Sequence, residues 1–453
     1  MQKTQTNKEK LKQFFQILLP ILLTQLGIFS MTFFDTMMSG NAGPSDLAGV
    51  AIGSSLWTPI FTGLSGILLA VTPIVAQQIG GGKHREVSFS VTQGIYLSFF
   101  MALVVIVIGS FALGPVLDAM KLAPEVREIA HGFLKALSFG MVPLFVYNAL
   151  RAYIDALGET KVSMFITLLS LPINIFLNYV LIFGNLGFPR LGGIGAGYAS
   201  AATYWALTLI ALYVIYSKEP FIRFRVLRVF YNISLKEWLS ILKIGVPIGF
   251  SIFFETSIFS AVTLLMSNYS TVVIASHQAA LNFASFLYMI PLSISMSLTI
   301  VVGFEAGAKR IRDAVKYAYI GISMAVCLAF LCGFVLFALR EQIAGLYTND
   351  PEVLKMTSSF LIFALFFQLS DALQAPIQGA LRGYKDVNVT LVMSLVSYWV
   401  IGLPTGYLFA AHTSLGAFGY WIGLITGLAA GAVTLSFRLI SVQRRKQDEW
   451  QKG

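Results

Sequence analysis

Long apolar runs separated by short polar loops make up most of the sequence. A helix needs about 20 mainly apolar residues to cross a bilayer, and several runs here are longer, which requires tilting or projection beyond the hydrocarbon. The fold class that this pattern predicts is an all-α integral membrane protein with twelve transmembrane helices. We expect these helices at residues 13–39, 47–79, 88–117, 129–157, 162–184, 193–217, 237–267, 272–306, 314–340, 353–381, 387–411 and 415–440.

The composition supports a lipid environment. Of the 453 residues 57% are hydrophobic and only 11% are charged, whereas soluble domains carry about 25% charged residues. A soluble enzyme and a nucleic-acid-binding protein are therefore excluded. The histidines show no metal-ligand spacing, so neither an intramembrane enzyme nor a cofactor is expected; they are His84, His131, His277 and His412.

The basic residues predict the orientation. With the N-terminus inside, 25 of the 31 Lys and Arg residues fall on inside segments and 6 on outside segments. Because Lys and Arg gather in cytoplasmic loops, we expect both termini in the cytoplasm and a multi-pass protein of the cell membrane, the inner membrane where a cell has two. The most basic loop, residues 218–236, also places arginines at the height of the lipid headgroups.

An internal repeat is visible at about half the chain length. Gly158 and Gly383 stand in loops of similar composition, and the loop 80–85 resembles the loop 305–310. Such repeats predict two six-helix lobes related by a pseudo-two-fold axis along the membrane normal, with the substrate site between them. The expected division is an N-terminal lobe at 1–217, a cytoplasmic linker at 218–236 and a C-terminal lobe at 237–453.

Three carboxylates fall within predicted spans, where an ionisable residue indicates function. They are Asp35, Glu255 and Asp371, and no Lys or Arg lies in the middle of any predicted span. We therefore expect them to be protonated, to bind a metal cation or to meet a cationic ligand. This is the profile of a cation-coupled transporter, although a carboxyl that is permanently protonated and hydrogen-bonded remains an alternative for each.

Polar side chains near these acids are candidate supporting groups. Asn174 and Asn178 are four residues apart and share a helix face, and Gln278 and Tyr288 are candidates to face Glu255. Aromatic rings beside the acids, including Phe367, suit a planar organic cation. Interhelical hydrogen bonds and lipid contact are the alternative interpretations.

The residues around these acids resemble the MATE (multidrug and toxic compound extrusion) transporters, and more specifically the bacterial NorM-like branch. The resemblance rests on the Asp35 segment, the stretch from Pro73 to Lys83, the Phe-Glu-Thr around Glu255 and the Ala-Leu-Arg-Gly at 380–383. It covers nearly the whole chain.

The resemblance implies an antiporter that exports cationic amphipathic drugs and dyes, such as fluoroquinolones and ethidium, in exchange for Na⁺ or H⁺. It also implies antibiotic resistance, alternating access between the lobes and a monomer among membrane lipids. Glu255 and Asp371 would form the cation site, as candidate ligands of a Na⁺ ion, and Gln278 and Tyr288 would support them. Asp35 would act with Asn174 and Asn178. Some Na⁺-coupled relatives have a Tyr where this chain has Phe367.

A lipid-linked oligosaccharide flippase of the same superfamily is the main alternative. Such a protein should line its cavity with several Arg or Lys to hold a pyrophosphate, and the predicted spans contain none at mid-height. The coupling ion, the natural substrate and the lobe that binds drug stay open at this point.

Overall fold

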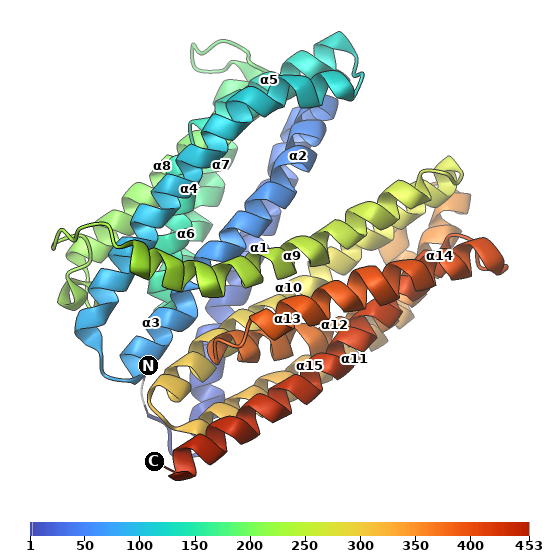
Figure 1. Cartoon of the computed structure of the whole chain (residues 1–453). Coiled ribbons are helices and arrows are strands. Elements are labelled where there is room, and N and C mark those ends of the chain that lie inside the picture. The colour runs from blue at the N-terminus through green and yellow to red at the C-terminus, as the bar shows by residue number, and fades with distance from the viewer. Residues whose placement is uncertain (2, 453) are drawn as a thin grey trace. The chain divides into compact units, whose positions relative to one another are not determined.

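The computed structural model describes residue 1 and residues 3–452, with side chains described as far as Glu449, and the regular secondary structure of this part of the chain is all helical (Figure 1). The first half contains α1 (Asn7–Ala42), α2 (Pro44–Leu68), α3 (Val71–Gly80), α4 (His84–Ala119), α5 (Pro124–Ser138), α6 (Met141–Ala156), α7 (Thr160–Phe183), α8 (Gly193–Ser217) and the 3-10 helix η1 (Phe221–Phe224). The second half contains α9 (Leu235–Met266), α10 (Thr271–Gly307), α11 (Ile311–Gly345), α12 (Pro351–Gly383), α13 (Asn388–Leu395), the π-helix η2 (Val396–Gly402), α14 (Leu403–His412) and α15 (Phe418–Lys452).

Every predicted span corresponds to helical structure. In the described residues eleven helical segments are long and apolar enough to cross a membrane, and twelve result when the bent pair α5 and α6 counts as one span. That pair bends by 52°. The bend falls at Phe139 and Gly140, where a Cβ on the glycine would lie 2.5 Å from the Cα of Ala201. The predicted fold class and the count of twelve are confirmed.

The chain divides into two compact units whose limits lie inside helices. The N-terminal unit comprises residues 19–249, and the C-terminal unit comprises residues 1–18 and 250–453. The first residues of α1 therefore pack with the C-terminal unit, and the first residues of α9 pack with the N-terminal unit. In the C-terminal unit α10, α11, α12 and α15 run side by side (Figure 1).

The internal repeat has a regular register in the backbone. Gly82 and Lys309 both adopt a left-handed conformation directly after a span, with φ of 71° and 57°. Gly158 and Lys385 do the same with φ of 82° and 62°, and the two pairs have the same offset along the chain. The pairing of Gly158 with Gly383 in the sequence was thus slightly out of register, because a lysine stands in the second repeat where the first has glycine.

Glycines allow two helical segments of the C-terminal unit to cross at close range. A Cβ on Gly423 of α15 would overlap the Cα of Gly406 and lie 2.5 Å from the carbonyl oxygen of Gly402. Small residues four positions apart let membrane helices approach closely, so that van der Waals contact stabilises their packing where the hydrophobic effect does not. This crossing fixes η2, and with it Tyr398, against α15.

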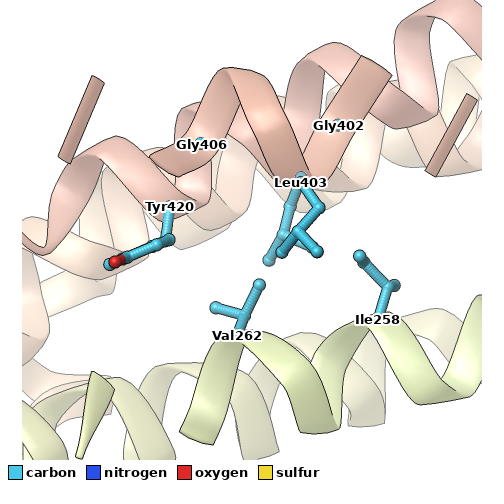
Figure 2. Close-up of a pocket in the computed structure, with 7 residues that line it drawn as sticks. Ile258, Val262, Gly402, Leu403, Gly406 and Tyr420 are labelled. Carbon is cyan, nitrogen blue, oxygen red and sulfur yellow. The ribbon is translucent and has the colours of Figure 1, made fainter. Parts of the chain in front are cut away.

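A shallow apolar recess lies beside this crossing (Figure 2). Ile258 and Val262 of α9 face Leu403 and Tyr420 across it in the close-up. No charged residue lines it, so we do not assign it to ion binding.

Candidate functional site

Asp35 lies in a cluster of neutral hydrogen-bonding groups in the N-terminal unit. The side-chain amide of Asn178 donates to Asp35 Oδ1 at 2.6 Å, and the Ser200 hydroxyl donates to Oδ2 at 3.3 Å. Asn178 also donates to Asn174 Oδ1 at 3.1 Å. We call these four residues the Asp35 cluster. The structure brings together all three residues predicted for this site and adds Ser200.

The helix geometry explains this arrangement. Asn174 and Asn178 are four residues apart on α7 and therefore lie on one face, and both side chains are fully buried. Asp35 on α1 is half-buried. No Lys, Arg or His lies within ion-pair distance of it among the described residues. Among the described residues, this carboxylate therefore accepts hydrogen bonds from uncharged donors only.

Glu255 and Asp371 lie in a second polar cluster, in the C-terminal unit. Tyr288 of α10 donates its hydroxyl to Glu255 Oε1 at 3.4 Å. Asp371 of α12 is 3% exposed and interacts electrostatically with Glu255. The structure thus brings together the two acids predicted as the cation site and the predicted Tyr288.

Sequence reasoning missed four members of this cluster, which are Gln374, Gln378, Arg382 and Tyr398. The Gln374 amide donates to the Tyr398 hydroxyl, and Arg382 donates to Gln378 Oε1 at 3.3 Å. Gln374 and Gln378 are three and seven residues after Asp371, so the same helix-face rule that paired Asn174 with Asn178 would have found them. We call the seven residues Glu255, Tyr288, Asp371, Gln374, Gln378, Arg382 and Tyr398 the Glu255 cluster.

The expectation that no basic residue meets the buried acids was wrong for Glu255. Arg382 is 7% exposed and interacts electrostatically with Glu255. The sequence placed Arg382 in a loop because the apolar run ends at Leu381, whereas α12 continues to Gly383. The guanidinium forms no ion pair with a carboxylate within 4.0 Å in the part of the chain that is described.

Gln278 and Phe367 have other surroundings. Gln278 is exposed and lies ten residues, about 15 Å along α10, from Tyr288, so its predicted role near Glu255 stays a prediction. Phe367 is 5% exposed and packs edge-on against Phe259 and Trp421, with ring centroids 5.6 Å and 6.1 Å away. These contacts place Phe367 in the hydrophobic core one turn before Asp371.

Several buried polar atoms in both clusters have no hydrogen-bond partner among the described residues. They are Asn174 Nδ2 and Asn178 Oδ1 in the Asp35 cluster, and Gln374 Oε1 and Gln378 Nε2 in the Glu255 cluster. Buried polar groups are normally hydrogen-bonded, so each orphan calls for an explanation. Amide and carboxylate oxygens are ligands for hard cations, and such an ion or a polar ligand would use them. No group of three or more His, Cys, Asp or Glu side chains converges in the described residues.

His277 has a structural environment. The Trp421 indole donates to His277 Nδ1 at 3.0 Å, and Nε2 lies 3.2 Å from the Thr263 hydroxyl. Because Nδ1 accepts, the ring proton of the neutral tautomer is on Nε2 and bonds to Thr263. Both nitrogens are therefore engaged.

The fold and these sites define a multi-pass membrane protein with buried acids in each half. The MatE family matches it at residues 20–180 and again at 247–408, so its two matches follow the internal repeat. The chain belongs to the MatE family of transporters.

Curated relatives cover almost the whole chain. The probable multidrug resistance protein NorM of Halalkalibacterium halodurans is 59% identical over 445 residues, which is 98% of this chain and 97% of the relative. The proteins of the same name from Bacillus licheniformis and Bacillus subtilis are 60% and 59% identical, each with 98% of both chains covered.

Solved structures share the fold. The eukaryotic MATE transporter AtDTX14 superimposes with a TM-score of 0.87 at 21% identity, over 98% of this chain and 99% of that one. A multidrug resistance MATE transporter in an outward-facing conformation gives 0.86 at 18% identity, over 97% and 99%. A MOP superfamily transporter from Pyrococcus furiosus, described as having a binding pocket of reverse polarity that suggests a different function, gives a TM-score of 0.85 at 19% identity, over 98% of this chain and 99% of that one.

Proposed function

We propose that this chain is a multidrug efflux antiporter of the cell membrane, which exports cationic amphipathic drugs and dyes in exchange for Na⁺ or H⁺ by alternating access. Family membership and relatives named as multidrug resistance proteins support efflux. The observation that carries the cation coupling is that Asp35, Glu255 and Asp371 all lie within spans and form no close ion pair with any described residue. A carboxylate held in this way is available to an incoming cation.

In this proposal the Glu255 cluster and the Asp35 cluster bind the coupling ion. Na⁺ or H⁺ is a transported substrate, and Glu255 and Asp371 would ligate it with the carboxamide oxygens nearby. Drug release follows if the drug and the ion bind different states with different affinities, because only a differential affinity shifts a conformational equilibrium. Both termini are cytoplasmic and the chain works as a monomer among lipids.

The flippase alternative would require a row of basic side chains to hold a pyrophosphate. The C-terminal unit offers Arg382, which is a single cation beside two acids. The excess of negative charge in this cluster favours a cationic ligand. Fold similarity to distant relatives does not decide the point, because a transporter with reverse pocket polarity shares the fold.

Purified protein in liposomes tests the proposal. Ethidium or a fluoroquinolone is followed after a Na⁺ gradient and then a pH gradient are imposed separately. We expect one gradient to drive transport and the combined Glu255→Gln and Asp371→Asn substitution to abolish it. Transport that ignores both gradients, or that survives the double substitution, contradicts the antiporter. Transfer of a lipid-linked sugar without any cation gradient would support the flippase.

A further inference from the structure

Arg382 is a buried guanidinium whose role the proposed function does not yet use. It lies next to last in α12, with 7% of its surface exposed, and the one hydrogen bond that its side chain forms among the described residues goes to the neutral Gln378. Arginine stays charged in proteins, and a buried charge is costly unless it is paired. A position so close to a helix end and yet buried without a direct carboxylate partner therefore needs a reason.

The polar side chains of α12 form one continuous stripe that ends at this residue. Asp371, Gln374, Gln378 and Arg382 follow one another at intervals of three, four and four residues, which keeps them on one helix face. The stripe is about 17 Å long at 1.5 Å per residue. Gln374 is held by Tyr398 of η2, so the stripe is connected to a second segment of the C-terminal unit.

The charged side chains of the Glu255 cluster together determine its net charge. Two carboxylates, Glu255 and Asp371, interact with each other electrostatically, and the Arg382 guanidinium interacts with Glu255. With both acids ionised, the cluster carries one net negative charge. Without the guanidinium it would carry two, and two buried like charges are unfavourable in a low-dielectric interior.

We propose that Arg382 is a positioning residue whose fixed charge compensates one of the two carboxylates, so that the Glu255 cluster takes up one monovalent cation in each cycle and not two. The inference rests on the proposed antiport. It adds that the number of charges moved by this cluster is set by an internal arginine.

The test compares wild type with four variants whose cluster charges lie between zero and minus two. Wild type and Arg382→Lys have a cluster charge of minus one, Arg382→Met has minus two, Glu255→Gln has zero, and the double variant Glu255→Gln with Arg382→Met returns to minus one. Each variant is reconstituted in liposomes, and the steady-state ethidium accumulation ratio is measured against an imposed membrane potential with no Na⁺ or pH gradient. One additional charge per cycle changes that ratio about 50-fold per 100 mV, since a charge moved through 100 mV corresponds to about 2.3 kcal/mol.

We expect Arg382→Met to move one more charge per cycle than wild type and Arg382→Lys to keep the wild-type value. Glu255→Gln should lose gradient-driven transport, and the double variant, whose cluster charge is again minus one, should regain part of it. If Arg382 had only a structural role, the double variant would transport ethidium no better than Glu255→Gln, and this result would overturn the proposal. If Arg382→Met does not yield folded protein by melting temperature and size-exclusion elution, the pair Glu255→Gln and its double variant decides in the same way.

A drug-free measurement separates this inference from the proposed function. The charge displaced by a jump in Na⁺ or H⁺ concentration is recorded from the same variants on a supported membrane. If wild type moves no ethidium, the antiport proposal fails, but displaced charge in the order Arg382→Met, wild type, Glu255→Gln still supports the charge role of Arg382. Equal displaced charge in all variants contradicts it.

Discussion

Two sets of buried or half-buried acids in this protein differ in what lies beside them. At helix ends, Asp155 pairs with Arg151 at 3.5 Å, Glu305 with Arg310 at 2.5 Å and Asp386 with Arg438 at 2.7 Å. Inside the spans, Asp35, Glu255 and Asp371 have no such partner among the described residues. Burial therefore does not separate the two sets, whereas the presence of an ion pair does.

The largest effect that this comparison predicts is the loss of transport when an acid inside a span is neutralised. Asp371→Asn keeps the side-chain shape but removes the charge that attracts the coupling cation. Interactions with a charged group are worth up to about 3 kcal/mol, so we expect gradient-driven ethidium transport to fall by about 100-fold. The melting temperature should not fall, because no ion pair is broken.

The reverse outcome is expected at a helix end. Glu305 is 1% exposed and Arg310 is partly buried, so Glu305→Gln leaves a guanidinium without its carboxylate and should lower the free energy of unfolding by about 1–3 kcal/mol. Thermal denaturation in detergent measures the loss, and transport per folded molecule should stay within about twofold of wild type. A variant that keeps its stability but loses transport would break the distinction between the two sets.

Within the Asp35 cluster, the comparison becomes one between two asparagines. Asn178 donates directly to Asp35, while Asn174 accepts a hydrogen bond from Asn178. Asn178→Leu removes a donor that stabilises the ionised carboxylate, and a less stabilised anion binds a proton more tightly. If the coupling ion is H⁺, we expect its half-saturating concentration to fall by about 10-fold; if it is Na⁺, we expect the half-saturating concentration to rise, because the unpartnered Asn178 Oδ1 is lost as a ligand. In either case Asn174→Leu should have a smaller effect. Equal effects would contradict this order of contacts.

The smallest effect is expected for Tyr288→Phe. The single hydrogen bond of this hydroxyl to Glu255 is 3.4 Å long, near the limit at which such bonds contribute. The half-saturating ion concentration should change by about two- to fivefold, and Tyr347→Phe, which loses a hydrogen bond to Asn282 outside both clusters, is the matched control. A change as large as that of Asp371→Asn would show that Tyr288 itself ligates the cation.

The spans could be predicted from the sequence because an apolar run of about 20 residues has few other stable locations. The breaks within spans could not. The bend at Phe139 and Gly140 lies where Gly140 closely approaches Ala201, and the π-helix at Val396–Gly402 ends at the glycine crossing with α15. Both are tertiary contacts that the pattern of apolar residues does not contain.

The candidate sites were predicted unevenly for a similar reason. The Asp35 cluster was accessible because Asn174 and Asn178 are four residues apart on one helix. Arg382 was missed because composition alone ends the span at Leu381, and only the packing of α12 shows that the next residue is buried. The placement of Gln278 on an exposed surface likewise depends on the rotation of α10, which spacing does not determine.

The matched turns at Gly82 and Lys309, and at Gly158 and Lys385, bear on how a protein of this size arose. A half-chain with six spans begins and ends on the same side of a bilayer. Two copies of such an ancestral gene, fused head to tail, would insert in the same direction, and a short loop would be enough to join them. After such a duplication the two polar clusters would have been free to diverge, and today the Asp35 cluster is held by amides while the Glu255 cluster contains an arginine.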